Sequence, residues 1–319
     1  MQKEKYIILP NKKDLSYYEK YNLNSFVLPL KDYSIGCEVY FDIDEINDLS
    51  NSHEVYVLMN KFLHNNIVKF RDLYKKFNDK IKFIVEDIGL TDIIDMKRLV
   101  LYENHILSNY KAINYLYDIG IKDVVINNDL TIKEIKEIID KSESNLYYYY
   151  IAKNNIMYSR RKLVSNFDKN YSINNHKDNH YLLYENISKK KLDIYEEDGS
   201  IVKYDKIFCA SKYLSDLSKI NKIIDFSYID ELNERMILEN IDNNKLCDLI
   251  DCDYYFLEND IKYKIGDMKW VMSCYCLLEI WIGLSLLLCM VLMLYILVVK
   301  IIVWELMLII FLLMRLEKV

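Results

Sequence analysis

The sequence predicts an α/β fold, in which a TIM-like (β/α) barrel is followed by a β-rich C-terminal extension and an apolar helical tail. Three observations lead to this prediction. In the first half of the chain, short apolar runs alternate with helical patterns, which is typical of a parallel sheet covered by helices. From about Ser172, strand-like runs follow one another. After Asp267 the composition changes abruptly, and Ile280–Val299 is an uncharged run.

The strands of the predicted barrel are short runs rich in Val, Ile and Tyr that are bounded by turn residues. They lie at Tyr6–Leu9, Ser25–Leu30, Val55–Asn60, Lys82–Glu86, Leu99–Tyr102, Asp123–Asn127 and Leu146–Ile151. No glycine-rich phosphate loop follows any of these strands, which disfavours an open dinucleotide-binding sheet. The pattern therefore predicts a barrel within residues 1–170.

Two helices between these strands carry clear boundary signals. Thr131 is followed three residues later by Glu134, which is a capping box at the start of a helix. A second helix is expected from about His105 to Ile119, and it ends at Gly120, a residue that commonly terminates helices.

The predicted extension covers residues 171–267. Its strands are joined by a turn at Asp198–Gly199, a dipeptide that is typical of hairpins. Helical stretches are expected at 213–220 and 228–243.

Composition narrows the class of protein. The net charge of −6 gives no basic face for nucleic acid, so we expect no nucleic-acid partner. The first ten residues, MQKEKYIILP, contain no secretory signal. The seven cysteines form no regular framework, which favours a reducing compartment. We therefore expect a cytoplasmic protein.

A ring of polar residues follows the predicted strands. Chemistry in a (β/α) barrel takes place at the C-terminal ends of its strands. The candidate ligand-binding residues at this mouth are Asn60, Glu86, Asp87, Asn104 and Asn127. The alternative is that these residues are polar only because strand ends are solvated.

A basic cluster follows the last predicted barrel strand. YSRRKLVSNF (Tyr158–Phe167) contains the candidate residues Ser159, Arg160 and Arg161 in an otherwise acidic chain. Such a cluster can hold a carboxylate or a phosphate. We expect the arginines near the barrel mouth, where they bind an anionic group or a partner's acidic surface. Pairing with the protein's own carboxylates is the alternative.

The spacing of potential metal ligands is poor. Cys247 and Cys252 lie five residues apart without a partner pair before residue 268. His176 and His180 have the i, i+4 spacing of a helical pair, but they lie in the asparagine-rich segment NNHKDNHY, which favours a solvated loop. The sequence therefore predicts no metal site and no cofactor.

Several segments carry a family resemblance. HILSNYKAINYLYDIGIKDVVINNDLTIKEIKEI (His105–Ile138), IMYSRRKLVSNF, DIDEINDL and VYVLMNKFLHNNIVKF resemble, in order, segments of peptidase family U32, the collagenase-like proteases. The resemblance covers roughly residues 5–265. It implies a TIM-like barrel with a β-rich extension and a hydrolase acting on peptides or proteins, with unassigned catalytic residues.

The chain departs from the family pattern at several positions. Tyr147, Ile151 and Ala152 occupy the places of a signature Glu and a His-Gly pair. The four cysteines with which some relatives bind an iron–sulfur cluster are missing. Shorter members often stand beside a longer one in tandem genes, so the resemblance implies an accessory or weakly active partner of a longer U32 protein. The alternative is a non-catalytic binding barrel or scaffold in an RNA- or cofactor-modifying complex.

The tail, residues 268–319, differs from the rest of the chain. It holds all three tryptophans and no asparagine. When the gene is read in the frame one base earlier, the codons of Met290-Val291 and those of Trp304-Glu305 must each give a glycine codon. The protein sequence in that frame contains YGADAVYIGG, which resembles the opening of a long U32 protein. We interpret the tail as a frameshift product. The alternative is a membrane anchor through residues 280–299, which are long enough to span a bilayer.

Overall fold

The computed structural model describes residues 5–103, 107–172, 180–184 and 191–258. The predicted tail, with both of its interpretations, lies outside these ranges. Within them, no helix combines the length and the apolar character that crossing a membrane would require.

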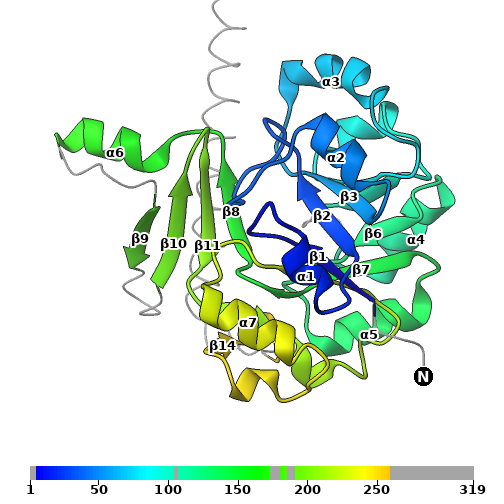
Figure 1. Ribbon diagram of the computed structural model, residues 1–319, viewed down its shortest axis with the longest axis vertical. Coiled ribbons are helices and arrows are strands. Elements are labelled where there is room, and N and C mark those ends of the chain that lie inside the picture. Colours follow the sequence, from blue (N-terminus) through cyan, green and yellow to red (C-terminus); the bar gives the residue numbers. More distant parts are fainter. Residues whose placement is uncertain (1–4, 104–106, 173–179, 185–190, 259–319) are drawn as a thin grey trace, which may run out of the picture. The chain divides into compact units, whose positions relative to one another are not determined.

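The barrel is a closed ring of parallel strands (Figure 1). Its order runs from β13 through β1, β2, β3, β4, β5 and β6 to β7, and the pairing of β7 with β13 closes the ring. The strands are β1 (Tyr6–Leu9), β2 (Ser25–Pro29), β3 (Glu54–Met59), β4 (Lys82–Val85), β5 (Leu99–Tyr102), β6 (Asp123–Val125), β7 (Asn145–Ala152) and β13 (Asn221–Asp225). The predicted TIM-like fold is confirmed, and strands β1 to β7 start within one residue of their predicted positions.

The eighth strand, β13, lies beyond the predicted boundary of the barrel at residue 170. Its sequence, NKIID, places a lysine directly before the two isoleucines. Lys222 is nevertheless buried, because its ammonium group donates to the carbonyl oxygens of Leu217 at 2.7 Å and Ile220 at 3.5 Å. Such backbone partners are supplied by the fold and are invisible in the sequence pattern.

Helices cover the outside of the barrel. They are α1 (Ser16–Glu19), α2 (Ile43–Leu49), α3 (Ile67–Tyr74), α4 (Tyr110–Asp118), α5 (Ile132–Lys141) and α7 (Glu231–Glu239). The helix expected from His105 starts at Tyr110, because Asn109 accepts a hydrogen bond from the amide of Ala112 and caps it. Gly120 follows its end with a φ of 109°, a conformation that glycine adopts without strain.

The capping box of α5 is present as predicted. The Thr131 hydroxyl accepts from the Glu134 amide, and the Glu134 carboxylate accepts from the Thr131 amide at 2.8 Å. We expect Thr131→Ala to lower the free energy of unfolding by about 1 kcal/mol. Thr131→Ser should retain most of the parent's free energy of unfolding, since serine keeps the hydroxyl group that caps the helix. Urea unfolding of the three proteins measures this, and equal losses in both variants would contradict the capping role.

Side chains alternate between two cores along each barrel strand. One core fills the barrel interior and includes Ile7, Tyr56, Ile84, Val100 and Tyr149. The larger core lies between the strands and the surrounding helices. Because successive side chains point to opposite faces of a strand, the inward parity continues past each strand end toward the mouth.

The extension starts earlier than the predicted residue 171, at β8, and it forms a second, antiparallel sheet with the order β8-β11-β10-β9. Its strands are β8 (Asn155–Ser159), β9 (His180–Tyr184), β10 (Lys191–Glu196) and β11 (Ser200–Tyr204), and α6 (Leu163–Tyr171) follows β8. The predicted turn at Asp198–Gly199 joins β10 to β11. Short strands β12 (Ile207–Cys209) and β14 (Cys252–Asp253) add to the barrel sheet beside β7.

The helical expectations for the extension are met only in part. The stretch 228–243 contains α7, as expected. The stretch 213–220 is wrong as an α-helix, because it holds the end of a 3₁₀ turn (Ser211–Tyr213) followed by further turns. These turns bring Leu217 and Ile220 into the core and lead the chain directly into β13.

Candidate functional site

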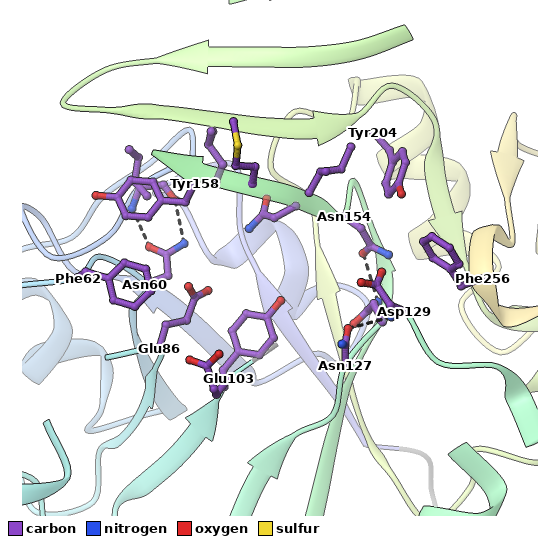
Figure 2. Close-up of a pocket in the computed structure, with 17 residues that line it drawn as sticks. Asn60, Phe62, Glu86, Glu103, Asn127, Asp129, Asn154, Tyr158, Tyr204 and Phe256 are labelled. Atoms are coloured by element: carbon purple, nitrogen blue, oxygen red, sulfur yellow. Dashed lines mark hydrogen bonds between the residues drawn. The ribbon is translucent and has the colours of Figure 1, made fainter. Parts of the chain in front are cut away.

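A cavity of about 460 Å³ lies at the C-terminal mouth of the barrel (Figure 2). Its lining combines strand-end residues of the barrel with residues of the extension. The lining residues are Ile35, Asn60, Phe62, Glu86, Tyr102, Glu103, Asn127, Asn128, Asp129, Asn154, Asn155, Ile156, Met157, Tyr158, Ile201, Tyr204 and Phe256.

The two sides of the cavity differ in chemistry. Carboxylates and amides follow barrel strands, and they include Glu86 after β4, Glu103 after β5 and Asn127 after β6. Aromatic and aliphatic side chains come largely from β8 and from later residues such as Tyr204 and Phe256. Among the described residues, no lysine, arginine or histidine lines this cavity, so the charged groups that they supply are carboxylates.

Glu86 and Glu103 form a pair of carboxyl groups on neighbouring strands. Figure 2 shows both side chains pointing into the same part of the cavity. Burial, and secondarily the negative charge of Glu103, raise the pKa of Glu86 to about 8. Glu86 therefore keeps its proton at neutral pH, and a protonated carboxyl can donate as well as accept a hydrogen bond.

Asn60 and Asn127 line the cavity as predicted, and both amides also shape the backbone around it. The Asn60 side chain accepts from the Ile35 amide at 2.8 Å and donates to the Ile35 carbonyl at 2.9 Å. The Asn127 side chain accepts from the Asp129 amide at 2.9 Å. The main role of the Asn60 side chain is thus to hold the backbone of the loop that contains Ile35.

The remaining candidates lie beside the cavity or outside the described residues. Asp87 caps the 3₁₀ turn Ile88–Asp92, and it also accepts from the Leu63 amide at 2.9 Å. Together with Arg160 it lines a second, open cavity of about 450 Å³, which shares Phe62 with the first.

The candidates Ser159 and Arg161 lie outside both cavities. The Ser159 hydroxyl accepts a hydrogen bond from the Arg161 amide, and the Arg161 side chain is exposed. Asn104 lies outside the described residues.

The expectation of a separate ligand at the two arginines stays a prediction. Arg160 lies near the mouth, because its cavity adjoins the larger one at Phe62. The Phe62 ring stacks on Tyr158, with centroids 6.0 Å apart, and this contact connects the barrel loop to β8.

Sequence reasoning left several lining residues out of the candidate site. Glu103 is a strand-end residue and was therefore detectable by the rule that found Glu86. Tyr158, Tyr204 and Phe256 were not detectable in this way, since only the packing of the extension brings them to the mouth.

The family model of peptidase family U32 matches residues 15–232. Among solved structures, one described as the structure of the U32 peptidase Mk0906 is similar, with a TM-score of 0.41 and 12% identity over 70% of this chain and 92% of that chain. No curated protein matches. Since the family model spans well over half of the sequence, the chain belongs to peptidase family U32.

Proposed function

We propose that this chain binds a peptide segment at the barrel mouth and acts as an accessory or weakly active partner of a longer U32 peptidase. Membership of the family supports a peptide or protein as the ligand. The cavity is suited to one, because amide and carboxyl groups on one side can bond a peptide backbone while the aromatic side receives apolar side chains.

The carboxyl pair is the observation that carries this proposal. Peptide hydrolysis requires a base that activates water and an acid that protonates the leaving amine. Two neighbouring carboxyl groups in different surroundings can divide these roles. With its pKa raised to about 8, Glu86 is suited to the acid role, and Glu103 to the base role.

The signature positions support a weak activity. Tyr147 is buried in the barrel interior, where its hydroxyl donates to Asp123 at 3.0 Å, and Ile151 packs in the outer core. These side chains hold the barrel together and supply no acid or base at the mouth. A longer homologue that carries the full signature would supply the missing chemistry.

The proposal is tested by hydrolysis of gelatin and of dye-labelled peptides. The purified chain is assayed alone and with a longer U32 protein of the same genome. We expect slow cleavage alone and faster cleavage in the mixture. Glu86→Gln and Glu103→Gln should each lower the rate of the chain alone by about 100-fold, whereas the exposed Glu239→Gln is the matched control.

Each result is decisive for part of the proposal. Parent-like rates in both glutamine variants would remove the carboxyl pair from the mechanism. Peptide binding without hydrolysis, alone and in the mixture, would establish the binding barrel instead. An absence of both peptide binding and association with the longer protein would overturn the proposal as a whole.

A further inference from the structure

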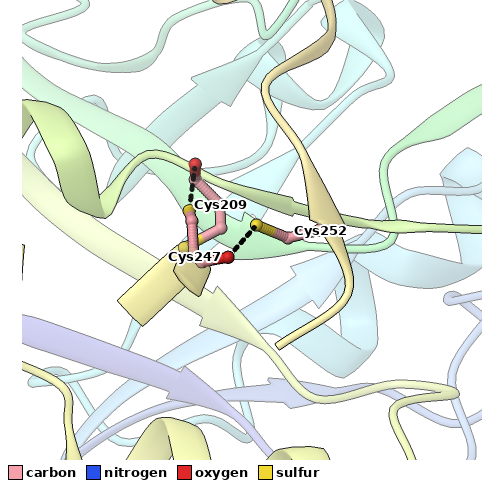
Figure 3. A group of neighbouring side chains, drawn as sticks. All are labelled: Cys209, Cys247 and Cys252. Atoms are coloured by element: carbon pink, nitrogen blue, oxygen red, sulfur yellow. Dashed lines mark hydrogen bonds between the residues drawn. The ribbon is translucent and has the colours of Figure 1, made fainter. Parts of the chain in front are cut away.

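Three thiol groups, one of which lies far from the other two in the sequence, meet at one edge of the barrel sheet (Figure 3). Cys209 ends β12, Cys247 lies in the 3₁₀ turn Leu246–Asp248, and Cys252 begins β14. The parallel pairing of β12 with β14 and the turn that precedes β14 bring them together. Their sulfur atoms all lie within 4.8 Å of one another.

We infer that Cys209, Cys247 and Cys252 bind one zinc ion. Zinc–thiolate bonds of about 2.3 Å in a tetrahedron place sulfur atoms about 3.8 Å apart. The three sulfurs therefore reach zinc geometry through shifts on the order of 1 Å. Soft thiolate ligands select Zn²⁺ over Mg²⁺ or Ca²⁺, which prefer oxygen.

The surroundings of the three thiols fit a metal site. All three are free of disulfides. Cys209 is buried, whereas Cys247 and Cys252 are partly exposed, so an ion can enter from solvent. The Ser211 hydroxyl lies 3.4 Å from the Cys247 sulfur, and it can orient a thiolate or a water molecule in the fourth position.

An iron–sulfur cluster held by four cysteines does not fit the described residues. Their fourth cysteine, Cys37, is buried in the barrel interior and is not part of this group. The sequence prediction of no metal site considered Cys247 and Cys252 without Cys209, which precedes Cys247 by 38 residues.

A zinc ion at this place would fasten the end of the described chain to the barrel. The pairing of β12 with β14 is short, with register partners Ile207–Cys252 and Phe208–Asp253. Phe256 follows Cys252 by four residues and lines the cavity at the barrel mouth. The ion would thus fix one wall of that cavity.

Zinc content and cobalt substitution test the inference. The parent protein for this test is the full chain in which Cys274, Cys276 and Cys289 are replaced with serine. The thiols that remain are then those of the described residues. We expect one zinc per chain and, with Co²⁺, an absorption band from thiolate-to-cobalt charge transfer. Cys247→Ser and Cys252→Ser should each weaken zinc binding at least about 100-fold, while Cys37→Ser should retain it.

Hydrogen exchange provides a readout that does not depend on activity. Adding zinc should slow amide exchange in residues 246–257 of the parent protein and leave the Cys247→Ser variant unchanged. Far-UV circular dichroism confirms that each variant is folded. Sub-stoichiometric zinc in the reduced parent, or unchanged zinc affinity in the Cys247→Ser/Cys252→Ser double variant, would overturn the inference.

Discussion

Replacing Glu86 with glutamine is expected to remove most of the loss of stability that accompanies a rise in pH from about 5 to about 8. The folded protein raises the pKa of this carboxyl from 4.5 to about 8. Between these values the folded state holds a proton that the unfolded chain has released. Stability contributed by Glu86 is therefore fully present below pH 4.5 and is lost as the pH rises through about 8.

The magnitude of this effect is several kcal/mol. The full shift corresponds to about 5 kcal/mol in the free energy of unfolding. Because Glu86 keeps contact with solvent in an open cavity, screening should reduce the effect to about half of that. Glutamine has no charge to desolvate, so the variant should be close to the parent at pH 5 and clearly more stable at pH 9.

Urea unfolding across this pH range measures the effect. Glu103→Gln should flatten the profile less than Glu86→Gln, because burial contributes more than the charge of Glu103 to the raised pKa. The control Glu239→Gln replaces an exposed carboxylate on α7 and should follow the parent. A Glu86→Gln profile with the parent's full slope would show that another group causes the pH dependence.

Replacing Lys203 with methionine is expected to destabilise the fold by about 3 kcal/mol. Lys203 lies on β11 of the extension, and its ammonium group lies 3.6 Å from the carboxylate of Asp225 at the end of β13. Both side chains are buried, at 1% and 9% exposure. Methionine fills the space but leaves the Asp225 charge without its cation, which costs more than the ion pair itself contributes.

A double-mutant cycle separates these contributions. Lys203→Met combined with Asp225→Asn should recover part of the loss, since the uncompensated charge is then gone. The control is Lys206→Met just after β11, which removes an exposed pair with Asp251 and should cost less than about 1 kcal/mol. Equal losses in Lys203→Met and Lys206→Met, measured by urea unfolding, would contradict the role of the buried pair.

The barrel was largely predictable because local chemistry marks its elements. The strands Tyr6–Leu9 and Leu99–Tyr102 have their predicted bounds, and Thr131 caps its helix as its spacing with Glu134 predicts. Turn residues and apolar periodicity act within a few residues, so they can be recognised without the fold. The strand β13 was missed because a lysine stands directly before its two isoleucines, and the turns just ahead of the strand present carbonyl oxygens to that lysine only in the folded chain.

The candidate site was predictable where strand parity determines it. Asn60, Glu86 and Asn127 line one cavity, as expected for residues that end parallel barrel strands. Asp87 follows Glu86 directly and therefore takes the opposite parity, which directs it to the amides of Leu63 and Gly89. Ser159 ends β8, whose other residues line the cavity, but neither Ser159 nor Arg161 is part of that lining.

The sequence by itself determined the barrel, the hairpin and the family, because these depend on patterns within short segments. The tertiary structure alone decided that the extension supplies the aromatic wall of the cavity, that Lys203 meets Asp225, and that Cys209 joins Cys247 and Cys252. The physical reason is the same in each case. Contacts between residues far apart in the chain depend on how whole elements pack, and no local periodicity records that packing.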